Sequence, residues 1–394
     1  MIRFTAIVIA IFMLLCTFAS CGNENFEDTK KETEKITEQQ IEKSTEDSYD
    51  NLFINNSNKS QENETLEDVK NNVPTVSTVH THSYVNGMCT ICKLSRSGKS
   101  ITFGSYPQSR VDDSTLKNTL NSKAGTLPTS QNSQAWTSYG YYINGAQSNF
   151  MWYIDITIDS DKYRGVYFTS YRPYYTTDPS SADDSAQDEN GYYTNQVYWF
   201  KYEPILWTVL SENSNNKVAF VLCDMLIDSQ EFYITDVGTR DIDGEKIYPS
   251  NYEYSTIRKW LNETFYNTAF TDFQKEMILV TTVDNSESTT NEYGKRYVCK
   301  DTYDSVFLLS CADFMNEDYA LCETSASVRK PTDYAKSQGA YVSDFSDYIG
   351  QAGWLLRSPH NDKNMSCVGY TGYGGYGEID YTIFGVLPAI QIKL

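Results

Sequence analysis

The chain has 394 residues, which is long for one domain and could hold one or two, and 40% of them are hydrophobic, enough for a buried core. Its formal net charge of -20 argues against nucleic acid as a partner and against direct adhesion to anionic lipid, because like charges repel. The 32 tyrosines suit an exposed recognition surface, since each ring has an apolar face and a polar tip. A Tyr- and Asn-rich composition also follows from an AT-rich genome, and both explanations stay open.

The first residues are typical of an export signal. Arg3 precedes the apolar stretch AIVIAIFMLL, which is too short to span a bilayer comfortably. The small residues of FAS then precede Cys21, a pattern that resembles the bacterial lipobox, in which the cysteine receives a diacylglyceryl chain. We expect a lipoprotein signal peptide over residues 1–20 and a mature protein anchored to the membrane on its extracellular face. The alternative is an ordinary cleaved signal peptide with an incidental cysteine.

Residues 21–79 are rich in Glu, Lys, Asn, Thr and Ser and nearly free of aromatic residues. Such a segment cannot bury enough apolar surface to offset the entropy lost on ordering. We therefore predict a disordered tether that holds the folded part away from the membrane.

A small unit follows at residues 80–96. His80, His82, Cys89 and Cys92 supply four ligands of the types that tetrahedral zinc prefers, and an Asn-Gly turn precedes the Cys-x-x-Cys pair. We predict a zinc-ribbon-like stub whose metal is structural, because four protein ligands leave no open coordination position. So short a unit also needs a metal ion or a cross-link to fold. The alternative is a Cys89–Cys92 disulfide, which would leave the two histidines unexplained.

From Ser100 to Leu394 the sequence is aromatic and strand-like, with no linker that divides it, so we expect one domain over residues 100–394. Residues 130–196 are rich in Tyr, Asn, Ser and Asp, which indicates an elaborated hairpin or long loops outside the core. Hydrophobic alternation and apolar runs predict strands at 101–108, 203–210, 217–226, 304–310, 353–359 and 389–394. The first of these runs into a turn at Pro107.

Two helices are predicted between these strands. Residues 255–262 have Ser255 as the N-cap, with Ile257, Trp260 and Leu261 at helical spacing. Residues 271–278 begin with a capping box of Thr271 and Gln274, and Phe273, Met277 and Ile278 are expected to form the buried stripe. Strands around a few helices without strict alternation indicate an α+β fold.

Six segments in order resemble Domain of Unknown Function 6273, a family of exported proteins of Gram-positive anaerobes. They read GSYPQ, EPILWTVL, YSTIRKWLN followed by NTAF, SVFLLS, WLLRSP and GVLPAIQIKL. The last departs from the family pattern, since Leu387 stands where the family has arginine. The pair WLLRSP and GVLPA also resembles the formylglycine-generating, sulfatase-modifying fold. That second resemblance implies a C-type-lectin-like architecture with paired terminal strands and long aromatic loops.

Known catalytic patterns are incomplete in this domain. A copper oxidase of the formylglycine-generating kind needs a close cysteine pair, and Cys311, Cys322 and Cys367 do not form one, so buried thiols or one disulfide are favoured. Asn361 and Asp362 do not complete a calcium-binding lectin set. His360 follows no nucleophile elbow. The pairing of Cys223, Cys299, Cys311, Cys322 and Cys367 stays open, and paired catalytic carboxylates remain an alternative.

Residues 353–381 combine an arginine and a histidine with tyrosines among glycines, a composition that resembles antibody binding sites. We predict a ligand-binding surface that includes Arg357, His360, Tyr370, Tyr373 and Tyr376. Trp354 and Leu356 are expected to point into the core, and Arg357 is also explained by a structural ion pair. The main hypothesis is a non-catalytic binding module for a glycan, a peptide or a cell-surface protein. The alternative is a hydrolase or modifying enzyme acting on cell-envelope or host polymers.

Overall fold

The computed structural model describes short stretches of backbone at residues 84–85, 88–89 and 95–97. From residue 99 onward it describes the whole chain except residues 140, 144–145, 173–185, 234–237 and 323. The predicted signal peptide, the tether, Cys21, His80, His82 and Cys92 all lie outside the described residues, as does the side chain of Cys89. No helix in the described part is long and apolar enough to cross a membrane.

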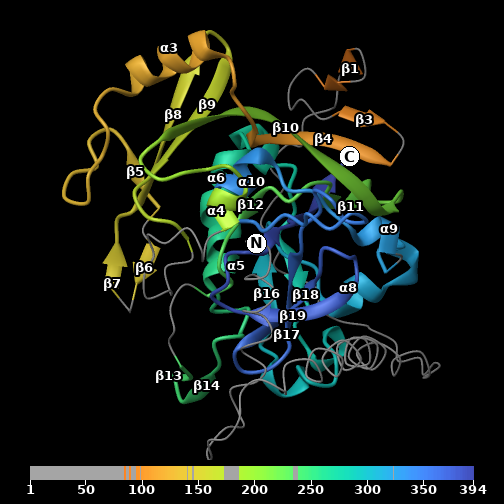
Figure 1. Ribbon diagram of the computed structural model, residues 1–394. Helices are drawn as coiled ribbons and strands as arrows, with labels where there is room; N and C mark the ends of the chain where they lie inside the picture. The colour runs from red at the N-terminus through yellow and green to blue at the C-terminus, as the bar shows by residue number, and fades with distance from the viewer. Residues whose placement is uncertain are drawn as a thin grey trace, which may run out of the picture. The chain divides into compact units, whose positions relative to one another are not determined.

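A ten-stranded sheet is the largest element, and its axis is the long strand β10 (Val197–Asn213). On one side β10 pairs with β4 (Ser100–Arg110) along most of its length. On the other side its first half pairs with β9 and its second half with β11, so the sheet forks (Figure 1). The remaining strands are β1 (Tyr84–Val85), β2 (Met88–Cys89), β3 (Ser95–Ser97), β5 (Thr137–Ser138), β8 (Met151–Ile158), β9 (Asp161–Phe168), β11 (Val218–Cys223) and β21 (Ala389–Lys393). Strands β1 to β3 continue the sheet beyond the edge of β4.

Strand β4 passes through Pro107 instead of turning there as the sequence predicted. The pairing with β10 shifts register on both sides of the segment, near Gly104 and near Pro107. Proline has no N–H to donate to a ladder, so a shift accommodates it. Gly104 has φ +78°, and a Cβ atom there would lie 2.6 Å from the Phe270 ring. Both residues bend the strand and let it continue.

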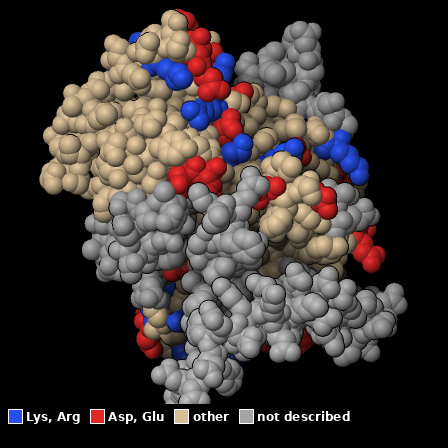
Figure 2. Space-filling view, viewed as in Figure 1, with Lys and Arg blue, Asp and Glu red and all other residues tan. Residues whose placement is uncertain are grey.

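The hairpin β8–β9 contributes to the core, which corrects the expectation that residues 130–196 lie outside it. Its side chains alternate between two hydrophobic clusters: Met151 faces the main core and Trp152 faces a second one. That second cluster lies under helix α3 (Ser114–Ala124) and includes Trp136 and Trp199. The Trp199 indole donates to Asn121 Oδ1 at 2.8 Å and so ties the helix to the sheet. Residues 125–154 contain no charged residue, and Figure 2 shows this region as a broad uncharged surface.

Short helices pack against the main core. Ser255 caps α5 (Thr256–Trp260) and Thr271 with Gln274 forms the predicted capping box of α7 (Asp272–Lys275). The predicted stripe of α7 is wrong in one place: this helix has a single turn, and Phe273 is 59% exposed while Met277 and Ile278, beyond it, are buried. The other helices are η3 (Leu261–Phe265), α6 (Tyr266–Ala269), α4 (Ala186–Glu189), α8 (Cys311–Met315), α9 (Thr324–Ser327), α10 (Asp333–Ser337), η4 (Glu287–Thr289), η5 (Lys295–Tyr297) and η6 (Glu317–Tyr319).

A second, five-stranded sheet holds the C-terminal motifs in the order β12-β20-β17-β18-β19. These strands are β12 (Asp228–Ser229), β20 (Gly385–Val386), β17 (Trp354–Pro359), β18 (Asn364–Val368) and β19 (Gly374–Glu378). Three two-stranded sheets complete the described strands: β6 (Tyr141–Ile143) with β7 (Ala146–Ser148), β13 (Arg240–Ile242) with β14 (Glu245–Ile247), and β15 (Thr281–Val283) with β16 (Thr302–Asp304).

The strand predicted at residues 304–310 is not formed. Strand β16 ends at Asp304, and the apolar run after it is buried but joins its neighbours through isolated contacts. One is the bridge between Phe307 and Ala389, and another is the hydrogen bond from Arg357 N to Leu309 O at 2.8 Å. A run of apolar residues indicates burial, and burial alone does not specify a ladder.

The fold is α+β, as predicted. The C-terminal strand β21 pairs with β11, with Ile390 and Ile392 buried as the alternation predicted. Strand β4 pairs with β10 and β3, so it and β21 lie on opposite sides of β10. The pairing of terminal strands that the lectin-like resemblance implied is therefore not seen between these two strands.

Candidate functional site

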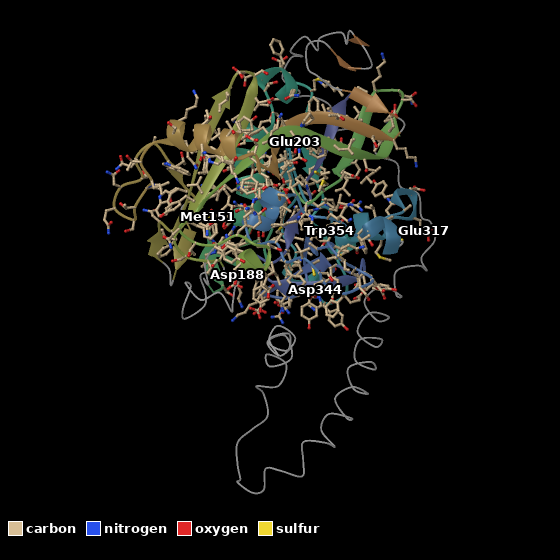
Figure 3. The ribbon with its side chains drawn as sticks, turned by 45° about the horizontal axis from the view of Figure 1, so that its top comes forward. Met151, Asp188, Glu203, Glu317, Asp344 and Trp354 are labelled. Atoms are coloured by element: carbon tan, nitrogen blue, oxygen red, sulfur yellow. The ribbon has the colours of Figure 1, made fainter. Side chains whose placement is uncertain are left out.

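The motif WLLRSP occupies β17, where every residue is buried. Trp354 and Leu356 have no exposed surface, which confirms that they point into the core, and Figure 3 shows Trp354 among packed side chains. The ladder to β18 is interrupted between Leu355 and Pro359, so the residues between them can bond elsewhere. This interruption releases Arg357 and Ser358 to reach the segment that precedes α8.

Arg357 is 5% exposed and bound on several sides. Its guanidinium donates to Leu308 O and to Asp313 Oδ2, each at 2.7 Å, and to Asp284 O at 3.1 Å. Asp313 also forms the capping box of α8 with Ser310. Arg357 thus makes the structural ion pair that the sequence offered as one explanation of this residue.

His360 lies directly after β17 and packs in an aromatic stack. Its ring lies parallel to that of Tyr376 on β19, with 4.2 Å between centroids and 4° between planes. The ring of Tyr293, from the turn before η5, is tilted by 42° to the His360 ring, with 5.2 Å between their centroids. His360 is 8% exposed, whereas Tyr376 and Tyr293 are 49% and 55% exposed. We call these three residues the His360 stack.

Burial lowers the pKa of His360 below its usual 6.5, so the imidazole is neutral at pH 7. Burial also raises the pKa of the Cys311 thiol, which the hydroxyls of Ser366 and Ser358 only partly oppose. A thiol that stays protonated is a poor nucleophile. The Cys311 thiol is therefore not activated as a nucleophile in this arrangement.

The edge strand β19 exposes Tyr376 because of the residues beside it. Gly377 faces the opposite side of the strand, and a Cβ atom there would lie 2.2 Å from the Phe384 ring. Tyr376 pairs in register with Ser366 of β18, so the two occupy the same face. The small residue on one face and the ring on the other set the direction of Tyr376.

The remaining predicted ligand residues lie in a separate group. The Tyr370 ring is stacked on Phe345 with 5.9 Å between centroids and 9° between planes, and it also contacts Tyr341 and Tyr348. Tyr373, in the turn between β18 and β19, is 50% exposed. The structure thus brings His360 and Tyr376 together, places Arg357 in the scaffold, and puts Tyr370 in another aromatic group.

Tyr293 and Asn291 were missed at the sequence level. Their segment reads TTNEYG, in which Asn291 Oδ1 accepts from the backbone N–H groups of Tyr293 and Gly294, each at 3.1 Å. An Asn followed three residues later by Gly does indicate such a turn. Nothing local indicates that the turn packs against Pro359, where a Cβ atom on Gly294 would lie 2.0 Å from the carbonyl oxygen.

An acidic group lies near the Tyr370 group. Glu189 has a raised pKa, chiefly through burial and then through the nearby charges of Asp188 and Asp344. Figure 3 labels both aspartates on the same side of the molecule. No set of three or more His, Cys, Asp or Glu side chains suited to a metal ion occurs among the described residues.

A comparison with protein families finds a match in the C-terminal part of the chain. Residues 207–394 match the family model described as "Domain of unknown function (DUF6273)". The matched part begins at Trp207 in β10 and includes β11, the helices after it, the five-stranded sheet and the His360 stack. The GSYPQ segment and the β8–β9 hairpin precede it. No curated protein and no solved structure matches the chain.

Proposed function

We propose that this chain is a surface-anchored bacterial lipoprotein whose C-terminal domain is a non-catalytic binding module for a glycan, a peptide or a cell-surface protein. The binding surface is the His360 stack, with Tyr373 in the adjoining turn. One observation carries the proposal: a buried neutral imidazole holds a half-exposed tyrosine ring flat against it, next to a second half-exposed ring. Rings fixed in this way bind a ligand at little entropic cost, because they lose few rotamers on binding.

The competing hypothesis is an enzyme acting on cell-envelope or host polymers. It needs a nucleophile or a general base poised to ionise, and burial disfavours the ionised forms of both the Cys311 thiol and the His360 imidazole. Neither is paired with the other as a nucleophile and base among the described contacts. Binding is therefore the function that the site supports best.

An array of glycans, peptides and surface proteins tests the proposal. The wild-type chain is expected to bind a defined set of spots, and Tyr376→Ala and Tyr293→Ala each to weaken binding by about tenfold or more, as expected for loss of an aromatic anchor. Tyr303→Ala is the matched control, because Tyr303 is 71% exposed on β16 and belongs to no ring contact of the stack. Binding that survives both site variants, or no binding at all, would refute the proposed surface.

The anchoring of the protein is part of the same proposal. A diacylglyceryl group on Cys21 would hold the chain at the extracellular face of the membrane, and the acidic tether would keep the domain away from anionic lipid. Cys21→Ser should release the protein from the membrane fraction of expressing cells. Retention of that variant in the membrane would remove the lipid anchor from the account.

The zinc-ribbon-like stub is proposed to carry one structural zinc on His80, His82, Cys89 and Cys92. Its backbone strands β1 to β3 extend the main sheet, so a metal there would stiffen the sheet edge. Purified full-length protein should contain close to one equivalent of zinc, and Cys89→Ser should lose it. Less than about half an equivalent in the wild type would exclude the site. The C-type-lectin-like architecture likewise remains a prediction, since no solved structure bears on it.

A further inference from the structure

A second aromatic surface is separate from the His360 stack and is centred on Tyr370, in the turn between β18 and β19. The Tyr370 ring is stacked on Phe345 and also contacts the rings of Tyr341 and Tyr348. Phe345 is 43% exposed, and Ile349, in the same loop, is 64% exposed. We call these five residues the Tyr370 surface. Exposed apolar side chains that form a group, unlike single ones, indicate an interaction site.

The loop that carries most of this surface is closed by its own backbone. The N–H of Ser343 donates to Gln351 O at 2.8 Å, and the N–H of Gly350 donates to Ser343 O at 2.9 Å. Asn190 Nδ2 donates to Ala340 O at 2.8 Å, which fixes the end of α4 beside the start of the loop. Side chains on such a fixed loop bind a partner with a small loss of entropy.

Carboxylates lie among these aromatic side chains. Asp344 and Asp347 are exposed in the same loop. Glu189, at the end of α4, has a pKa that is raised by partial burial and then by the charges of Asp188 and Asp344, with no cation in opposition. The pKa of Tyr341 is raised by burial first and then by neighbouring groups that include Asp344 and Glu189. We call Asp344, Asp347 and Glu189 the acidic set, and its charges adjoin the rings.

The nearby lysines leave the acidic set unpaired. Lys336 forms its ion pair with Asp333, at 3.0 Å. Lys330 passes Gly350, where a Cβ atom would lie 4.0 Å from its Cε. Within the part of the chain that the structure describes, no ion pair joins either lysine to the acidic set. Residues 173–185, which precede α4 in the sequence, include three aspartates and no lysine or arginine.

We propose that the Tyr370 surface and the acidic set bind a basic segment of a partner protein. The head group of a lysine or arginine is attracted to the face of a tyrosine ring and to a carboxylate, and its alkyl stem packs on apolar side chains. Because the carboxylates come from two elements, α4 and the loop at 343–351, they suit a segment with several positive charges. The net charge of -20 also attracts such a partner at long range.

The test measures the binding of a fluorescently labelled lysine-rich peptide to the full-length protein, by fluorescence anisotropy. Peptides of the same length with glutamine or glutamate in place of lysine are the controls. At low ionic strength we expect the lysine-rich peptide to bind and the two controls not to bind. Its affinity should decrease as salt is added, because salt screens exposed charges.

Matched variants locate the binding site. Asp344→Asn combined with Asp347→Asn removes two charges and keeps the side-chain shape, so binding should weaken about tenfold, as for the loss of two exposed ion pairs. Asp159→Asn combined with Asp243→Asn makes the same change in net charge at two exposed hairpin turns, where φ is 54° and asparagine is tolerated. This control should bind as the wild type does. Phe345→Ala, which removes an exposed ring, should also weaken binding about tenfold.

Each contrary result overturns a stated part of the proposal. No binding of the lysine-rich peptide at low ionic strength overturns it entirely. Equal losses in the two double variants also overturn it, because net charge alone would then explain binding. Binding of tetramethylammonium without binding of the peptide would replace the basic segment by a small cation. Circular dichroism checks folding, and the two asparagine replacements keep the test valid if Phe345→Ala disturbs the loop.

The result is independent of the function proposed for the His360 stack. That function is tested with Tyr376→Ala and Tyr293→Ala, which are expected to leave binding of the lysine-rich peptide unchanged. If Tyr376→Ala abolishes binding of this peptide while the double replacement of Asp344 and Asp347 does not, the basic segment binds the His360 stack and the assignment to the Tyr370 surface is wrong.

Discussion

At the residue scale, the motif WLLRSPH divides into a scaffold half and a surface half. Arg357 joins β17 to the Leu308 carbonyl oxygen before α8, to the Asp313 carboxylate within α8 and to the Asp284 carbonyl oxygen after β15. His360, three residues later, supports the exposed ring of Tyr376. Both residues were predicted as ligand contacts, and the contacts of Arg357 favour a role in stability instead.

Replacing Arg357 tests that division. Arg357→Met leaves Asp313 without its buried partner, and breaking such a pair typically costs about 3–5 kcal/mol; since the Asp313 side chain is 25% exposed, water will reduce the loss toward the lower value. Urea denaturation should show this decrease in the free energy of unfolding. Lys300→Met is the control, because the Lys300–Glu245 pair is exposed and such pairs contribute less than about 1 kcal/mol. If Arg357→Met has normal stability but no longer binds ligand, Arg357 contacts the ligand and does not stabilise the fold.

At the element scale, the caps and the alternation were read correctly, whereas the turn at Pro107, the strand at 304–310 and the packing of distant segments were not. The caps at Ser255 and Thr271 and the alternation in β21 depend on neighbours within a few residues, so the sequence predicts them. The second hydrophobic cluster depends on pairing of β8 with β9 and on α3, which composition does not reveal. The same limit applies to the site: Tyr376 was predicted, but His360 contacts both Tyr376 and Tyr293, and these contacts join three separate segments.

The bend in β4 gives a prediction for this scale. Gly104→Ala should destabilise the fold for two reasons, since φ is +78° and the new Cβ atom would meet the Phe270 ring at 2.6 Å. Gly125→Ala is a control with a similar φ of +69° and no atom within 4 Å, so it should lose only the backbone strain, about 1–3 kcal/mol. Thermal unfolding is expected to show a larger decrease for Gly104→Ala, because overpacking adds about 1–3 kcal/mol. Equal decreases would mean that the ring moves freely and does not set the bend.

At the scale of the whole molecule, buried acids make stability depend on pH. Asp228 is 1% exposed and accepts from Tyr106 Oη at 2.7 Å, and burial raises its pKa to about 6. In the unfolded chain an aspartate has a pKa of about 3.9. Between these values the native state holds more protons than the unfolded state, so this group lowers stability as pH rises from about 4 to about 6.

Asp228→Asn removes that ionisation. The two-unit difference in pKa corresponds to about 3 kcal/mol, so the stability of the variant relative to the wild type should rise by an amount of that order between pH 4 and pH 7. Urea denaturation across this range measures the change. Asp155 has a lowered pKa, because burial, which raises it, is outweighed by the hydrogen bond and the charge of Arg164. Its contribution to the pH dependence of stability is the same in the wild type and in Asp228→Asn. Parallel stability profiles for the two proteins would show that Asp228 ionises in the folded state at its ordinary pKa.

The central claim is that the half-exposed rings held by His360 form a binding surface. The most direct measurement is calorimetric titration of the ligand that binds most tightly on the array into the wild type, Tyr376→Ala and Tyr303→Ala. The account predicts that Tyr376→Ala binds about tenfold or more weakly and that Tyr303→Ala binds as tightly as the wild type. Equal affinity in all three proteins, with folding intact, would contradict it.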